Sequence, residues 1–194
     1  MLRRLQLSRK DFVVISERAR RRGILFLSTP SDEDSVDLLE QLDVSAFKIG
    51  SGDLTNLPFL GYVAKKNKPI IVSTGMAYLE EVEEAVSTIR NQGNNQIILL
   101  QCTSSYPADP SDSNLRAMIT LRDSFHLPIG FSDHTPGLEV SLAAVALGAV
   151  LIEKHFTLSR RLAGPDHKSS LEPTEFRKLV NAIRVIEKAL GDSV

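Results

Sequence analysis

The fold is decided by the stretch PIIVSTGMAYLEEVEEAVSTIRNQ, residues 69–92, in which a short apolar run leads directly into a helical pattern. The run Pro69–Thr74 has the length of a strand, and its lack of strict alternation indicates burial on both faces. One face of a helix over Tyr78–Gln92 would carry the apolar side chains Leu79, Val82, Val86 and Ile89. The stretch therefore predicts one βα unit.

The same unit recurs along the chain. Five further apolar runs are predicted to be strands: Ile24–Ser28, Ala46–Gly50, Ile97–Thr103, Pro128–Ser132 and Val150–Phe156. Helical patterns separate them, including Leu138–Leu147 and Pro173–Leu190, which Gly191 is expected to end. Ser8 and Asp11 predict a capping box at the start of a first helix. Six alternating units predict a parallel sheet with right-handed crossovers in one α/β domain.

Two architectures satisfy this pattern, a doubly wound sheet and a (β/α)₈ barrel. A dinucleotide-binding version of the doubly wound sheet is disfavoured, because no Gly-x-Gly-x-x-Gly turn follows the first run. No linker rich in glycine, proline or serine divides the 194 residues. We therefore treat residues 1–194 as one domain.

Composition excludes several classes of protein. The formal net charge is −1 and no long run of one sign occurs, which argues against binding to nucleic acid or to a membrane surface. No apolar stretch approaches the roughly 20 residues of a membrane span, and the N-terminus does not resemble a signal peptide. The single cysteine, Cys102, excludes an internal disulfide and is expected to be a small core residue. We expect a cytoplasmic protein.

Small hydroxyl side chains stand at the ends of the predicted strands: Ser28, Thr29, Ser51, Ser73, Thr74, Thr103, Ser104 and Ser132. In both architectures, ligands bind beyond the carboxyl ends of the strands. Hydroxyls and exposed backbone N–H groups bind phosphate or carboxylate oxygens, and Lys48 would add a cation. At any single position, an ordinary turn residue is the better explanation. The set as a whole favours an anion-binding site.

Two histidines, His134 and His155, end neighbouring runs. Adjacent parallel strands lie about 4.8 Å apart, so the two imidazoles can share one cation. Two histidine ligands leave positions open for water and substrate, as in catalytic metal sites. Asp133 and Asp166 are carboxylates that could orient a ligand histidine or a bound water. Buried histidines are also common as satisfied core residues, so the residues alone leave both interpretations open.

Seven motifs in order resemble one family, the sialic acid (N-acetylneuraminate) synthases and their relatives that make legionaminic and pseudaminic acids. The motifs are FKIGSGD (47–53), PIIVSTGM (69–76), LLQCTSSYP (99–107), IGFSDHT (129–135), AVALGA (144–149), IEKHFTL (152–158) and GPDHKSSLEP (164–173). The resemblance covers essentially the whole chain. It implies a TIM barrel of the (β/α)₈ type, present here only in part, because a complete barrel needs roughly 250 residues and eight strands.

The resemblance implies an enzyme that condenses phosphoenolpyruvate with an N-acetylated amino sugar, N-acetylmannosamine in the type member, and releases phosphate. It also implies a divalent cation, Mn²⁺ or Mg²⁺. Six positions match those that contact phosphoenolpyruvate: Thr29, Lys48, Ser51, Ser73, Ser104 and Ser132. His134 and His155 match the metal ligands, and Tyr106 and Asp166 match sugar-side positions. Asp53 stands where many members have glutamate. Catalytic roles are expected for Lys48, Asp53 and Asp166.

The family places two further βα units before the first run, and a small antifreeze-like domain after the barrel of a homodimer. We therefore expect an incomplete barrel that is poorly stable, oligomeric or inactive when isolated. The alternatives are a non-catalytic remnant that binds metal, phosphate or a partner chain, and a legionaminic or pseudaminic acid synthase. A deoxy-sugar-acid synthase acting on a phosphorylated aldose is less favoured, because the strand ends offer no second, arginine-rich phosphate site.

Overall fold

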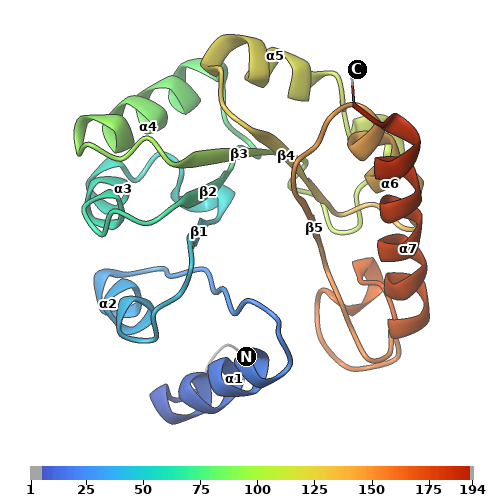
Figure 1. Cartoon of the computed structure of the whole chain (residues 1–194), viewed down its shortest axis with the longest axis horizontal. Coiled ribbons are helices and arrows are strands. Elements are labelled where there is room, and N and C mark those ends of the chain that lie inside the picture. The colour runs from blue at the N-terminus through green and yellow to red at the C-terminus, as the bar shows by residue number, and fades with distance from the viewer. Residues whose placement is uncertain (1–5, 193–194) are drawn as a thin grey trace.

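A computed structural model describes residues 6–192 and shows a curled, half-closed parallel sheet with helices on its convex side (Figure 1). The described residues form five strands, which pair in the order of the chain. They are β1 (Phe47–Ile49), β2 (Ile70–Ser73), β3 (Ile97–Cys102), β4 (Ile129–Asp133) and β5 (Ile152–Lys154). The fold is thus α/β and of the TIM-barrel type, but incomplete.

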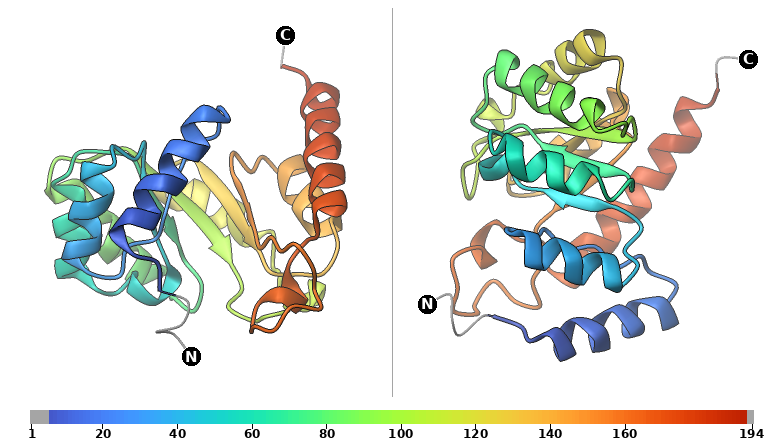
Figure 2. Two further views of the ribbon diagram at one scale, coloured as in Figure 1. Left: turned by 90° about the horizontal axis from the view of Figure 1, so that it is seen from below. Right: turned by 90° about the vertical axis from the view of Figure 1, so that its left-hand side faces the viewer.

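Seven α-helices lie outside the sheet or beyond its edge (Figure 2). They are α1 (Arg9–Arg21), α2 (Glu33–Gln41), α3 (Leu57–Ala64), α4 (Leu79–Asn91), α5 (Ala117–Phe125), α6 (Glu139–Ala146) and α7 (Pro173–Leu190). Short 3₁₀ turns occupy Ser51–Asp53, Pro110–Asp112 and His167–Ser169. Within residues 6–192, no helix is both long and apolar enough to cross a membrane.

Helix ends follow the local signals in the sequence. The predicted capping box is present at α1, where the Ser8 side chain accepts from the backbone N–H of Asp11 and the Asp11 carboxylate accepts from that of Ser8. Gly191 ends α7 with φ of 62°, a conformation that glycine adopts without steric cost. The bounds predicted for α7 are confirmed, and those of α4 and α6 differ from prediction by one residue at each end.

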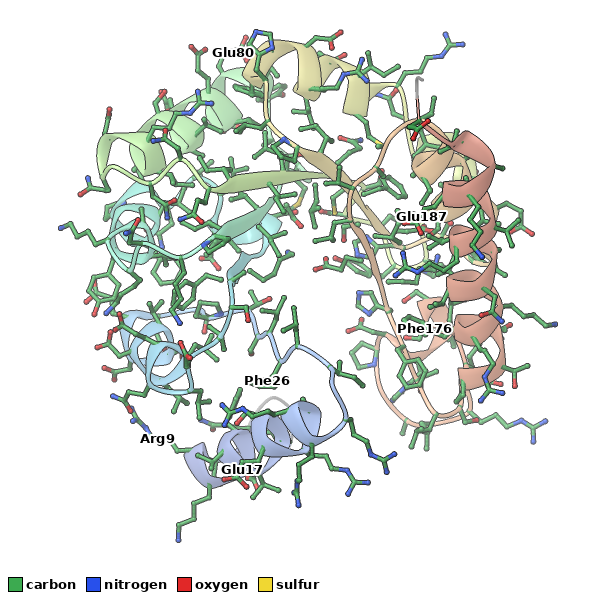
Figure 3. All side chains as sticks on the ribbon, in the orientation of Figure 1. Arg9, Glu17, Phe26, Glu80, Phe176 and Glu187 are labelled. Carbon is green, nitrogen blue, oxygen red and sulfur yellow. The ribbon has the colours of Figure 1, made fainter. Side chains whose placement is uncertain are left out.

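One predicted strand is wrong. The segment Ile24–Ser28 has no regular secondary structure and forms no ladder with β1 among the described residues, so the sheet has five strands instead of six. Ile24 and Leu25 are exposed. Phe26 instead turns toward α1, where its ring centroid lies 6.2 Å from that of Phe12 (Figure 3). An apolar run becomes a strand only if a neighbouring strand takes up its backbone groups, and among the described residues no strand does so here.

Alternation along the strands divides their side chains between two layers. Phe47, Val72, Leu99 and Phe131 lie in the main core between the sheet and the helices. Each such side chain contributes about 1.5–3 kcal/mol when fully buried. The concave side holds a smaller apolar cluster of Ala46, Ile71 and Leu100. Polar residues of the same alternating set follow toward the carboxyl ends of the strands, and they form the site described next.

Candidate functional site

Concave-side residues from all five strands meet at the carboxyl ends of the sheet. The ladder pairs Cys102 with Ser132 and Ser132 with Glu153, so these three stand at one level. Because side chains two residues apart share a face, His134 and His155 follow on the same side, one step beyond Ser132 and Glu153. The register alone therefore brings the predicted anion-binding and metal-binding residues together.

Lys48 is a buried cation at the centre of this group, only 8% exposed. Its ammonium nitrogen donates to Ser73 Oγ at 2.8 Å and lies 3.5 Å from Glu153 Oε2. The other oxygen of Glu153 accepts from Ser132 Oγ at 2.7 Å. Lys48, Ser73, Glu153 and Ser132 thus form one connected chain across the concave side, which we call the lysine–glutamate chain. A phosphate or carboxylate group at this position would meet a fixed cation and two hydroxyls, and it would compete with the Glu153 carboxylate for them.

Sequence reasoning missed Glu153. It lies two residues before His155, so the period of a strand places both side chains on the same face. The prediction treated Val150–Phe156 as a buried apolar run and did not apply that alternation to its one acidic residue. The side chain of Glu153 is 39% exposed, so it faces the concave side with room for a ligand.

A second polar group surrounds Gly75, just after β2. The Gly75 N–H donates to Ser51 Oγ at 3.0 Å. A Cβ atom built on Gly75 would lie 2.5 Å from Ser104 Oγ and 2.8 Å from Ser51 Oγ. Glycine is therefore required for these two hydroxyls to approach the backbone so closely. The predicted residues Ser51 and Ser104 come together here, beside Cys102.

The two histidine rings face each other with centroids 5.2 Å apart. Nδ1 of His134 lies 2.8 Å from the carbonyl oxygen of Thr103. A carbonyl oxygen only accepts, so Nδ1 carries the hydrogen and the lone pair of His134 is on Nε2. The ring of Tyr106 lies 4.2 Å from that of His134 and 5.5 Å from that of His155, measured between centroids. The predicted Tyr106 therefore covers the histidine pair.

The surroundings shift the pKa values of these groups in different directions. Burial, and next the nearby His134, lowers the pKa of His155, against the opposing charges of Asp166 and Glu153. Burial also acts to lower the pKa of His134, but hydrogen bonds to Cys102 and to the Thr103 carbonyl outweigh it and raise the value. A lowered pKa favours the neutral form of His155, which is the form that binds a metal, whereas the raised pKa of His134 means that a proton competes with a cation there.

Cys102 is buried, as predicted, but it belongs to the concave side. Its Sγ lies 4.0 Å from His134 Nδ1 and 3.8 Å from Ser51 Oγ. Burial acts to raise the pKa of this thiol, and the hydrogen bond with His134 is the largest of the effects that together lower it. The thiol therefore contacts both the histidine pair and the Gly75 group.

Three predicted residues lie at the margin of this group. Thr29 is exposed, and its Cγ2 lies 3.8 Å from a Cβ built on Gly50, beyond the end of β1. Asp53 lies in the 3₁₀ turn after β1, with no side-chain hydrogen bond or ion pair to any residue between 6 and 192. Asp166 is exposed in the loop after β5, and its charge acts on Tyr106 and His155.

Asp133 does not orient a histidine, contrary to one expectation from the sequence. It is 0% exposed, and its partners are Thr135, Ser141 and Lys154. The reason is the alternation of the strand: Asp133 and His134 are neighbours, so they point to opposite faces. Asp133 therefore lies in the outer layer, toward α6.

The histidine pair offers a candidate cation two ring nitrogens. Among the residues that the structure describes, no group of three or more histidine, cysteine, aspartate or glutamate side chains is arranged to enclose a metal. Two imidazoles alone leave most coordination positions for water or substrate. The pair is therefore suited to an open site and not to a closed structural one.

Comparison with known proteins gives a consistent picture. The chain matches the model of the NeuB family over residues 1–194. It is 52% identical over 196 residues to N,N'-diacetyllegionaminic acid synthase of Campylobacter jejuni, a match that covers 100% of this chain and 59% of that protein. It is 40% identical over 190 residues to N-acetylneuraminate-9-phosphate synthase of Mus musculus, covering 97% of this chain and 53% of that protein.

A solved structure agrees with these matches. The N-acetylneuraminic acid (sialic acid) synthetase of Leptospira borgpetersenii, in complex with citrate, superposes with a TM-score of 0.93 and 40% identity. The superposition covers 97% of this chain and 66% of that one. The chain thus spans little more than half the length of the two curated relatives above. Because the family match extends over every residue, the chain belongs to the NeuB family.

Proposed function

We propose that this chain carries the phosphoenolpyruvate and metal sites of a nonulosonic acid synthase. The reaction joins phosphoenolpyruvate to N-acetylmannosamine, or to a related N-acetylated amino sugar, and releases phosphate. The observation that carries this proposal is the lysine–glutamate chain, which runs from Lys48 to Ser132 and lies beside the pair His134 and His155. An anion site next to an open metal site suits a reaction between a phosphorylated acid and an aldehyde.

Phosphoenolpyruvate would bind through its anionic groups. Lys48 and Ser73 offer a charge-assisted contact, and Ser51 and Ser104 offer hydroxyls around the Gly75 N–H. Fixing both ends of the molecule turns its methylene carbon toward a second substrate, and such orientation is a large part of catalysis in two-substrate reactions. Thr29 would complete this set from the far side of β1.

His134 and His155 would hold a divalent cation through ring nitrogens, Nε2 in the case of His134. Manganese suits two nitrogen donors better than magnesium, which prefers oxygen ligands and keeps its waters. When bound, the cation would polarise the aldehyde oxygen of the open-chain sugar. Tyr106 lies against the pair, and Tyr106 and Asp166 would contact the sugar.

The proposed reaction would form a carbon–carbon bond first, and water would then replace phosphate. The methylene carbon of phosphoenolpyruvate would bond to the aldehyde carbon, whose oxygen would take a proton from solvent and become a hydroxyl, while the carboxylate that later accepts a proton from the attacking water returns one to solvent. Water adds to the cationic carbon that bears the phosphate ester, and phosphate leaves as the keto acid forms. Glu153 or Asp53 would take the proton of that water, and Glu153 is the better placed, since it already contacts Lys48 and Ser132.

The identity of the sugar separates two candidates. The N-acetylmannosamine type follows from the sequence motifs, whereas the 52% identity to a legionaminic acid synthase favours a diacetylated amino sugar as acceptor. Phosphate release from phosphoenolpyruvate with manganese and each sugar would distinguish them. With the two preceding βα units of the family supplied, we expect release that depends on one sugar and disappears in Lys48→Met, but not in the distant control Lys68→Met. Binding of manganese and phosphoenolpyruvate without release, even with those units supplied, would favour the non-catalytic alternative.

A further inference from the structure

A second ion pair lies directly behind the two histidines, on the outer face of the sheet. The ammonium nitrogen of Lys154 lies 2.8 Å from Asp133 Oδ2, and the two side chains are 1% and 0% exposed. The residues are direct partners in the ladder between β4 and β5. This pair therefore joins the carboxyl ends of the two strands that carry His134 and His155.

The polar atoms of the pair have further partners. Oδ1 of Asp133 accepts from the backbone N–H of Thr135 at 2.8 Å and from its hydroxyl at 2.7 Å. Oδ2 of Asp133 also accepts from the hydroxyl of Ser141 on α6, and Lys154 Nζ donates to the Thr135 carbonyl at 2.6 Å. The pair therefore connects β4, β5, α6 and the turn after β4 through one buried network.

The two residues of this ion pair directly precede the two histidines in the sequence, so the buried network lies next to the proposed metal site. Asp133 directly precedes His134, and Lys154 directly precedes His155. The ladder between β4 and β5 ends at this pair, and one rigid peptide unit separates each member from its histidine, so the pair restrains the two histidine backbones at the point where the ladder stops. The turn that follows His134 is held by the same carboxylate, through Thr135.

We propose that Asp133 and Lys154 are positioning residues, which fix the separation of the His134 and His155 rings and so the affinity of the cation site. This inference rests on the proposed metal binding by the histidine pair. A buried ion pair is in general weak support for stability, since apolar replacements are often neutral. Apolar side chains could fill this space equally well, so packing does not explain why two charges are buried here. Placement of the histidine ligands does.

The test uses the double variant Asp133→Asn/Lys154→Met in this chain. It leaves no buried charge, keeps an acceptor for Thr135 and removes the link between the strands. Manganese affinity is measured by electron paramagnetic resonance, and folding by circular dichroism and thermal unfolding. We expect a folded protein whose dissociation constant for manganese rises on the order of 10-fold, as for changes in groups that orient ligands. The control is Asp43→Asn/Lys68→Met, which removes a surface pair and should leave the affinity unchanged.

A folded double variant with the affinity of the unsubstituted chain would overturn the proposal, even if its stability were lower, because the pair would then be structural only. If the double variant does not fold, Lys154→Arg is measured instead, because it keeps both buried charges paired and changes the geometry of the link between the strands. A threefold rise in its dissociation constant is expected, and no change would overturn the proposal. An unsubstituted chain that binds no manganese would overturn the inference together with the metal part of the proposed function. Equal binding by chain and variant would overturn the inference alone.

Discussion

Nδ1 of His134 lies 2.8 Å from the backbone carbonyl oxygen of Thr103, at the end of the neighbouring strand β3. This contact fixes the tautomer of the ring and leaves the lone pair on Nε2, the atom that would bind the proposed cation. The residue that orients the histidine is therefore a backbone group of the strand next to it, and not the acidic neighbour Asp133 that the sequence suggested.

The histidine pair should account for manganese binding. His155→Gln removes one of two nitrogen donors, so the manganese affinity should fall by at least about 10-fold, the loss seen even for outer partners of a ligand. The measurement is titration of the chain with manganese, followed by electron paramagnetic resonance. His126→Asn is the matched control, because His126 is an exposed residue with φ of 53° at the end of α5, where asparagine is tolerated. Equal loss in both variants would contradict a site at the pair.

Lys48 should dominate the binding of phosphoenolpyruvate. Lys48→Met removes a buried, charge-assisted donor worth roughly 1.5–3 kcal/mol, which corresponds to roughly a 10- to 150-fold weaker affinity. Isothermal titration calorimetry with phosphoenolpyruvate measures this directly. Lys68→Met, at a lysine that pairs with Asp43 and the Val44 carbonyl before β2, should bind as the unsubstituted chain does. A Lys48→Met chain of unchanged affinity would place the anion elsewhere.

Phosphoenolpyruvate binding should be sensitive to substitution of Gly75, because two hydroxyls lie beside this residue. In Gly75→Ala the new methyl would meet Ser104 Oγ and Ser51 Oγ at 2.5 and 2.8 Å, so both hydroxyls must rotate away. We expect weaker phosphoenolpyruvate binding with a small change in thermal stability, since serine side chains move easily. Gly52→Ala, where a Cβ meets nothing within 4 Å, is the control. The prediction is wrong if the two variants bind alike.

Acid should weaken the fold partly through Asp37. Its carboxylate accepts from Lys66 Nζ and from the Tyr62 hydroxyl, each at 2.7 Å, and these bonds, that from Lys66 foremost, lower its pKa below 3.8. The unfolded chain therefore binds a proton more readily, so this contribution is complete above about pH 4 and is lost as the pH falls through the lowered pKa of the folded state.

The check is urea unfolding as a function of pH for the chain and for Asp37→Asn. Below about pH 4, the unfolding free energy of Asp37→Asn should decrease less with falling pH than that of the unsubstituted chain. The effect is small, because the group is exposed to solvent. Asp34→Asn, on the same helix and with no ion pair among the described residues, should keep the full fall. Identical curves for the chain and Asp37→Asn would exclude this contribution.

Most of the fold could be predicted from the sequence because its signals are local. The capping box at Ser8, the amphipathic faces of α4 and α7 and the stop at Gly191 depend on residues within a turn or two. Ile24–Ser28 could not be predicted in the same way. Whether an apolar run becomes a strand depends on a neighbour that pairs with it, and the run itself does not contain that information.

In the candidate site, too, some residues could be predicted from local sequence, whereas others depend on how the strands pair. The hydroxyls at the strand ends and the two histidines were found because the carboxyl ends of parallel strands meet at one edge. Glu153 and the Asp133–Lys154 pair were not, since their roles depend on register and on which face each residue takes. Register is a property of two strands together, and it follows from packing across the whole sheet.

One measurement tests the central claim most directly: a crystal structure of this chain grown with manganese and phosphoenolpyruvate, with anomalous scattering used to locate the metal. We predict a manganese peak at coordination distance from Nε2 of His134 and from the ring of His155. An anionic group of phosphoenolpyruvate should contact Lys48 and Ser73. A manganese peak away from the histidine pair, or phosphoenolpyruvate bound outside the carboxyl ends of β1–β5, would contradict the account.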